Sequence, residues 1–190
     1  MTDPDADVRE AAAYALQKMN APEGFELVRS ALLRECPGPV QAKMISYAAR
    51  LGRNQALSWL IEMGTDSASW AGLGAAIGRI ELGDMSAQPV LFDYLKSPDP
   101  NQRAFAAAWM MPWIRTMSET IGRHVNLPEK PDQGITDRQV DEMMAWWRNY
   151  VTPKLWTDTL AMRDRRDPMR RKLGRLMGAR HRAIDYLNIN

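Results

Sequence analysis

The chain has 190 residues, of which 45% are hydrophobic and 25% are charged, and its formal net charge at pH 7 is +2. This length and balance predict a single soluble globular domain with enough chain to bury a core. The single cysteine, Cys36, excludes a disulfide framework, and no apolar run approaches a membrane span or a secretory leader, so we expect a cytoplasmic protein without membrane contact.

Helix-favouring residues dominate the chain, and alternating strand patterns are nearly absent. Apolar spacing and turn residues predict six successive helices over residues 5–19, 22–36, 40–51, 54–63, 67–82 and 86–95. In the first of them, Asp7 and Glu10 fit a capping box. One apolar stripe is expected to face the core there, formed by Val8, Ala11, Ala12, Ala15, Leu16 and Met19.

The fifth predicted helix contains three glycines, Gly72, Gly74 and Gly78. Each costs a helix roughly 1 kcal/mol relative to alanine. We therefore expect a neighbouring helix to approach this one closely.

The second half of the chain continues the helical pattern. A helix is predicted from Asp99 to about residue 123, with a kink or break at Pro112. A loop over residues 125–135 follows, and a capping box at Thr136 and Gln139 begins the next helix. Further helices are predicted from residues 152–153 and 167–168. The last is amphipathic, with one apolar face formed by Met169, Leu173, Leu176, Met177 and Ile184.

One stretch occurs twice, as PDADVREAAAYAL at residues 4–16 and PDPNQRAFAAAWM at residues 98–110. The two copies, 94 residues apart, share Pro4/Pro98, Asp5/Asp99, Arg9/Arg103, Ala12/Ala106 and Ala13/Ala107. Corresponding positions near the starts of alternate helices, Val8, Val40, about Ser69 and Gln102, follow at intervals of 32, about 29 and 33 residues. A period near 30 built from helix pairs is typical of a solenoid, in which each pair buries its apolar stripe against its neighbours.

These residues resemble the HEAT-like repeat family, especially the short bacterial HEAT repeats related to those of phycobilisome lyases. The resemblance covers about residues 2–115 and implies an all-α superhelix of stacked helix pairs. We expect a repeat array over residues 1–124 and a divergent helical cap over residues 136–190, continuous with the array as one domain. Members of this family mostly bind other proteins, some bind nucleic acid, and a few are enzymes.

Repeated charges in such arrays usually serve the repeat itself. We therefore interpret Asp5, Arg9, Asp99 and Arg103 as structural positions, with the arginines pairing with aspartates of neighbouring repeats. The alternative is that the arginines contact a ligand. Trp146 and Trp147, together with Trp156, form either a packed cap or a partner-binding platform.

The basic residues are concentrated at the C-terminus. Residues 1–150 contain 15 Lys/Arg and 19 Asp/Glu, whereas residues 151–190 contain 10 and 4. Arg166, Arg170, Arg171 and Arg175 form like-charge i, i+4 pairs, which an anionic partner would relieve. That partner is an acidic protein, the acidic body of another copy, or a nucleic-acid backbone; otherwise these arginines form a solvated helix face.

Catalytic and metal-binding motifs are absent from the sequence. His124 and His181 have no metal-ligand neighbourhood, Cys36 has no nucleophile motif, and the glycines follow no strand that would make a phosphate loop. We predict no cofactor, no metal and no catalytic residue. The leading hypothesis is a non-enzymatic protein-interaction scaffold with a concave surface of inner helices. The alternatives are nucleic-acid binding through the basic tail, and a lyase or glycosylase-type enzyme using the same concavity.

Overall fold

The computed structural model describes residues 1–66, 68–125, 127 and 135–166, with side chains described as far as Met162. Every regular element in these residues is helical, which confirms the predicted all-α class. The elements are α1 (Ala6–Met19), α2 (Gly24–Ala31), α3 (Gly38–Gly52), η1 (Arg53–Gln55), α4 (Ala56–Met63), α5 (Trp70–Glu81), η2 (Met85–Ala87), α6 (Gln88–Leu95), α7 (Pro100–Ile121), α8 (Asp137–Tyr150) and α9 (Pro153–Arg166).

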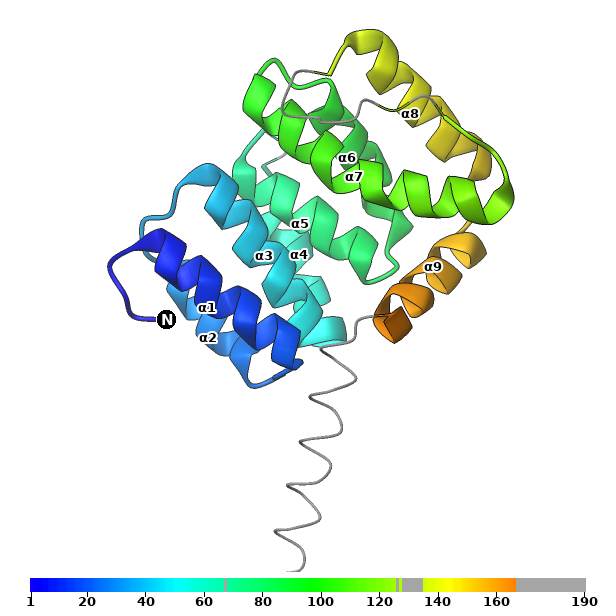
Figure 1. Ribbon diagram of the computed structural model, residues 1–190. Coiled ribbons are helices and arrows are strands. Elements are labelled where there is room, and N and C mark those ends of the chain that lie inside the picture. Colours follow the sequence, from blue (N-terminus) through cyan, green and yellow to red (C-terminus); the bar gives the residue numbers. More distant parts are fainter. Residues whose placement is uncertain (67, 126, 128–134, 167–190) are drawn as a thin grey trace, which may run out of the picture.

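The helices stack as pairs, as expected for a solenoid. The first helices of the pairs, α1, α3, α5 and α7, follow one another across the molecule, and α2, α4 and α6 lie behind them (Figure 1). Contacts run between successive first helices, and the contact of α3 with α5 is the most extensive among the described elements. Helix α9 contacts α7.

The tight contact between α3 and α5 depends on the glycines of α5. A Cβ atom on Gly74 would lie 2.7 Å from the carbonyl oxygen of Ala42, and one on Gly78 would lie 2.8 Å from the Cβ of Ala49. Both distances are too short for a real side chain. The expectation that a neighbouring helix approaches the glycine-rich helix closely is therefore confirmed.

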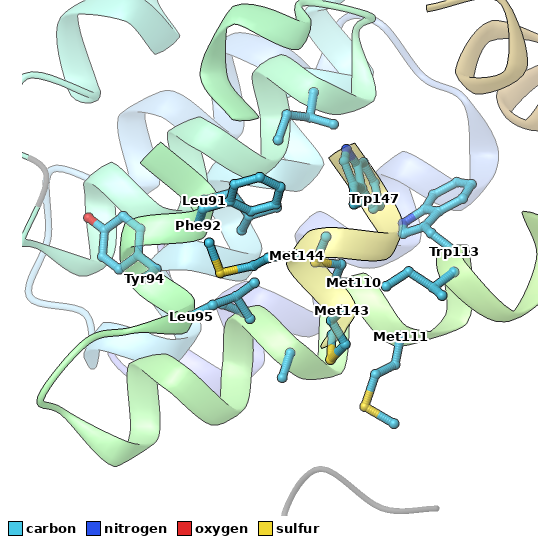
Figure 2. Close-up of a cluster of buried hydrophobic side chains, with 14 of the residues drawn as sticks. Leu91, Phe92, Tyr94, Leu95, Met110, Met111, Trp113, Met143, Met144 and Trp147 are labelled. Atoms are coloured by element: carbon cyan, nitrogen blue, oxygen red, sulfur yellow. The ribbon is translucent and has the colours of Figure 1, made fainter. Parts of the chain in front are cut away.

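The core consists of two clusters along the stack. One joins α1, α2, α3 and α4 to Ala75 of α5, and the other joins α5 to α9. Methionines fill the second cluster where α6, α7 and α8 meet, together with Trp113 and Trp147 (Figure 2). Flexible thioether side chains suit the irregular gaps between non-equivalent helices.

The start of the stack differs from the sequence-based expectation. Asp5 caps α1 by accepting a hydrogen bond from the amide of Asp7 at 2.8 Å, so the helix does not begin with a capping box at Asp7 and Glu10. The buried face of α1 consists of Arg9, Ala13 and Gln17, whereas Val8, Ala11, Ala15 and Met19 are exposed. Of the predicted stripe, Ala12 and Leu16 are half-buried and Leu16 packs on α2, whereas among the described residues no helix covers Val8, Ala11, Ala15 and Met19.

Two other expectations concern helix ends. The capping box at Thr136 and Gln139 is present and begins α8. The sequence predicted a kink or a break at Pro112. Helix α7 continues through this residue to Ile121, so it is not broken there. The residues around Pro112 remain packed in the core, since Met111 and Trp113 are both buried. Tertiary packing on both sides of the proline holds the helix together despite the lost backbone bond.

Candidate functional site: the face of the first helices

Polar side chains connect α1 to α3. The Tyr47 hydroxyl donates to Glu10 Oε1 at 3.0 Å, and the Lys43 ammonium lies 3.6 Å from Glu10 Oε2. The rings of Tyr14 and Tyr47 pack with their centroids 5.6 Å apart. Burial and the neighbouring Glu10 carboxylate raise the pKa of Tyr47 above its ordinary value, so its hydroxyl stays protonated and able to donate.

A second polar cluster connects α3, α5 and α7. The Glu81 carboxylate accepts from Arg50 Nε at 2.6 Å and from Arg50 Nη2, and Trp109 Nε1 donates to Glu81 Oε1 at 3.0 Å. The Glu81 side chain is fully buried. A buried carboxylate requires partners of this kind, and a forked arginine together with an indole N–H supplies them. Three successive first helices are thus held at fixed positions relative to one another.

A cavity of about 440 Å³ lies near the N-terminal ends of the same helices. Its lining residues come from α3, α5 and α7 and the segment before α7: Pro39, Trp70, Asp99, Asn101, Ala104, Phe105 and Ala108. Trp70 and Phe105 meet edge to face, with ring centroids 5.6 Å apart. Gly38 makes room for Trp70, because a Cβ there would lie 2.0 Å from Trp70 Cδ1.

The chemistry of this cavity is apolar with one acidic edge. Aromatic rings, proline and alanines form most of its walls, and Asp99 and Asn101 are its polar lining residues. One oxygen of Asp99, Oδ1, caps α7 by accepting from the amide of Asn101 at 2.8 Å. Such a cavity suits an apolar side chain, and a basic group next to that side chain would be attracted to Asp99.

The predicted repeat residues have local roles. Asp99 caps α7 in the same way that Asp5 caps α1. Arg103 Nη1 bonds to Asp137 Oδ1 of α8 at 2.9 Å. Arg9 is buried and donates to backbone carbonyls instead of to an aspartate side chain: those of Asp3 (2.9 Å), Pro4 (2.8 Å) and Glu35 (2.5 Å). It fastens the N-terminal segment to the end of the first helix pair.

The tryptophans of the C-terminal helices are used inside the core. Trp147 is completely buried and packs 5.4 Å from Trp156, and Trp146 is buried and donates to the carbonyl of Arg123 at 2.8 Å. Trp156 donates to the carbonyl of Ile80 at 2.7 Å, which attaches α9 to α5. We therefore do not include Trp146 and Trp147 in a binding surface.

Most of the basic tail lies outside the residues that the structure describes. Arg170, Arg171 and Arg175 lie outside the described residues, and Arg166 is the last residue of α9, its side chain undescribed. Within the described part of the chain, no group of three or more His, Cys, Asp or Glu side chains could hold a metal ion. No described helix is both long and apolar enough to cross a membrane.

Sequence reasoning missed both the Glu81 cluster and the aromatic cavity. The sequence indicates only that Trp70 and Phe105 lie in helices, because their contact depends on how α5 and α7 pack. The offset of 94 residues contained one indication: it pairs the small Ala11 and Ala15 with the large Phe105 and Trp109. Large side chains that replace small ones at matched repeat positions are candidates for a role specific to that repeat.

The N-terminal part of the stack is similar to a known repeat family. Residues 1–77 match the family model for HEAT repeats. This stretch covers the first two helix pairs and most of α5. Neither the curated proteins nor the solved structures that were searched contain a match to this chain.

Proposed function

We propose that this protein is a non-enzymatic scaffold that binds a protein partner through the face of its first helices, on the basis that residues 1–77 match the family model for HEAT repeats. The observation that carries the proposal is the aromatic cavity between Pro39, Trp70 and Phe105. Its lining residues come from three successive repeats, so the cavity exists only in the assembled stack. Surfaces of this kind are what helical repeats offer to partners.

The rigidity of this face supports the same proposal. Arg50, Glu81 and Trp109 fix α3, α5 and α7 relative to one another. A partner that binds a preformed cavity does not have to order it, so less of the binding free energy is lost. The partner expected at this face presents an apolar side chain with a lysine or arginine nearby. An acidic partner, as predicted for the tail arginines, would bind elsewhere.

Site-specific photo-crosslinking tests the location of binding. A photoreactive amino acid replaces Ala108, which is exposed at the cavity, or Ser58, which is exposed on α4 in the second layer. We expect the Ala108 probe to form one discrete protein adduct in cells that produce the chain, and the Ser58 probe to form none. Adding Ala104→Arg, which fills the cavity with a charged side chain, should abolish the adduct. Identical adducts from both positions, or an adduct that survives Ala104→Arg, would refute binding at this face.

A further inference from the structure

One end of the stack has an apolar surface that no described helix covers. Val8 and Met19 of α1 are 48% and 41% exposed, and Ala11 and Ala15 are exposed between them at helical spacing. Other sides of α1 are occupied: Glu10 bonds to Tyr47 of α3, and Leu16 packs on Gly24 of α2. The stripe therefore faces away from α3, toward the outside of the stack.

The second helix extends this surface. Phe25 and Arg29 of α2 pack against Trp59 of α4, toward the interior of the stack. Leu27 lies two residues from each of them, so it points to the opposite side of the helix, and it is 50% exposed. We call the surface of Val8, Ala11, Ala15, Met19 and Leu27 the N-terminal end face.

The second copy of the repeated segment indicates what the corresponding side of α7 contacts. The offset of 94 residues pairs Val8 with Gln102 and Ala15 with Trp109 of α7. In α7 these positions bond to the preceding repeat: Gln102 Nε2 donates to the carbonyl of Ala68 at 2.8 Å, and Trp109 Nε1 donates to Glu81 Oε1 at 3.0 Å. The corresponding side of α1 is therefore the side on which a preceding helical element would pack.

The surroundings of the N-terminal end face are acidic. Residues 1–36 contain seven Asp/Glu and four Lys/Arg. Arg9 is buried, and Arg29 pairs with Glu26 at 3.0 Å, so two of these cations already have structural roles. Asp3, Asp5, Asp7 and Glu23 remain exposed on the first helix pair. A helix that covers the apolar stripe would gain from positive charge along its edges.

Residues 167–190 of the same chain have the matching composition. They contain six Lys/Arg and two Asp/Glu. Their apolar residues Met169, Leu173, Leu176 and Met177 recur at helical spacing, as in a helix with one apolar face and basic sides. An amphipathic helix that lays its apolar face on an apolar surface is a common mode of recognition.

Helix α9, which precedes this segment in the chain, and α1 belong to opposite ends of the stack. Trp156 attaches α9 to the carbonyl of Ile80 in α5 and packs against Trp109 and Trp113 of α7. Figure 1 shows α1 and α9 on opposite sides, with α3 and α5 between them. We propose that residues 167–190 of one copy bind the N-terminal end face of a second copy, which joins copies head to tail. The proposal is independent of the cavity and its partner.

Sedimentation velocity of complementary full-length variants tests this contact. A face variant carries Val8→Glu and Met19→Glu, and a tail variant carries Arg170→Glu, Arg171→Glu and Arg175→Glu. The wild type should associate as its concentration rises, and each variant alone should associate at least about tenfold more weakly. An equimolar mixture should form one-to-one dimers, because the face variant keeps its tail and the tail variant keeps its face. Higher salt should weaken the wild-type association.

Ile61→Glu provides the matched control. Ile61 is as exposed as Leu27 but lies on α4, away from the N-terminal end face, so this variant should associate like the wild type. Thermal unfolding followed by circular dichroism verifies that each variant is folded. The proposal is wrong if the wild type stays monomeric at about 1 mM, if the face variant associates like the wild type, or if the mixture stays monomeric. Binding of duplex DNA by a wild type that stays monomeric would assign the tail to nucleic acid and also overturn the proposal.

Discussion

Replacing Glu81 with glutamine is expected to weaken the stack where α3, α5 and α7 meet. The Glu81 carboxylate is fully buried and is bonded by Arg50 and by Trp109. Glutamine has nearly the same shape, so the substitution opens no empty space in the core. Its amide oxygen can still accept the hydrogen bond from Trp109. The substitution removes the negative charge that compensates the Arg50 guanidinium.

The size of the effect follows from the burial of the pair. Breaking a buried ion pair by removing one partner costs about 3–5 kcal/mol, because the other charge is left uncompensated. Arg50 is partly exposed and can recover some hydration, so Glu81→Gln should cost about 3 kcal/mol. In Arg50→Met the charge left behind is the fully buried carboxylate, so the cost should be about 5 kcal/mol. The double replacement should cost less than the sum of the two.

Urea unfolding monitored by circular dichroism measures these free energies. The control is Lys154→Met, which breaks an ion pair with Asp158 in which both side chains are mostly exposed. That pair should contribute at most about 1 kcal/mol. If Glu81→Gln costs no more than Lys154→Met, the buried carboxylate does not hold the repeats together and our account of the rigid face is wrong.

Three further predictions concern local features. Gly74→Ala should lower the free energy of unfolding by about 1–2 kcal/mol in urea titrations, because the clash with Ala42 outweighs the gain in helix propensity. Asp99→Ala should cost about 1 kcal/mol in the same assay and Asp99→Asn much less, since asparagine also caps a helix. Burial and nearby Asp66 raise the pKa of Tyr94 to about 12 from an ordinary value of 10.0, so the unfolded state loses this proton first. Stability is therefore retained below pH 10 and falls as the pH rises toward 12, and Tyr94→Phe should make that fall shallower in pH-dependent melts.

The parts of the fold that the sequence predicted are locally determined. Asp99 and Thr136 cap helices through bonds to amides two or three residues away, so turn chemistry alone marks where these helices begin. The close contact at the glycines of α5 is predictable for a related reason. Glycine destabilises a helix, so three glycines in one helix indicate compensation by a closely packed neighbour. The order of the helix pairs followed from the repeated segment and its period.

The candidate site could not be predicted because its contacts join distant residues. Glu81 meets Arg50 and Trp109 across separations of 31 and 28 residues. Trp70 meets Phe105 only because α5 and α7 belong to successive pairs. Apolar spacing shows that a helix has an apolar face, but the position of the helix in the stack decides whether that face is covered. This is why the stripe of α1 was expected in the core and is exposed.

The two copies of the repeated segment differ where the stack differs. Asp5 and Asp99 are the same residue with the same capping role, since both helices must begin. At the side facing a preceding repeat, α1 has Val8, Ala15 and Met19 where α7 has Gln102, Trp109 and Trp113. Gln102 and Trp109 of α7 fit one particular preceding repeat through directed bonds to the carbonyl of Ala68, just before α5, and to Glu81 of α5. The α1 residues are apolar and form no such bonds. They therefore suit a partner segment that binds through apolar side chains and through positive charge, and residues 167–190 contain both.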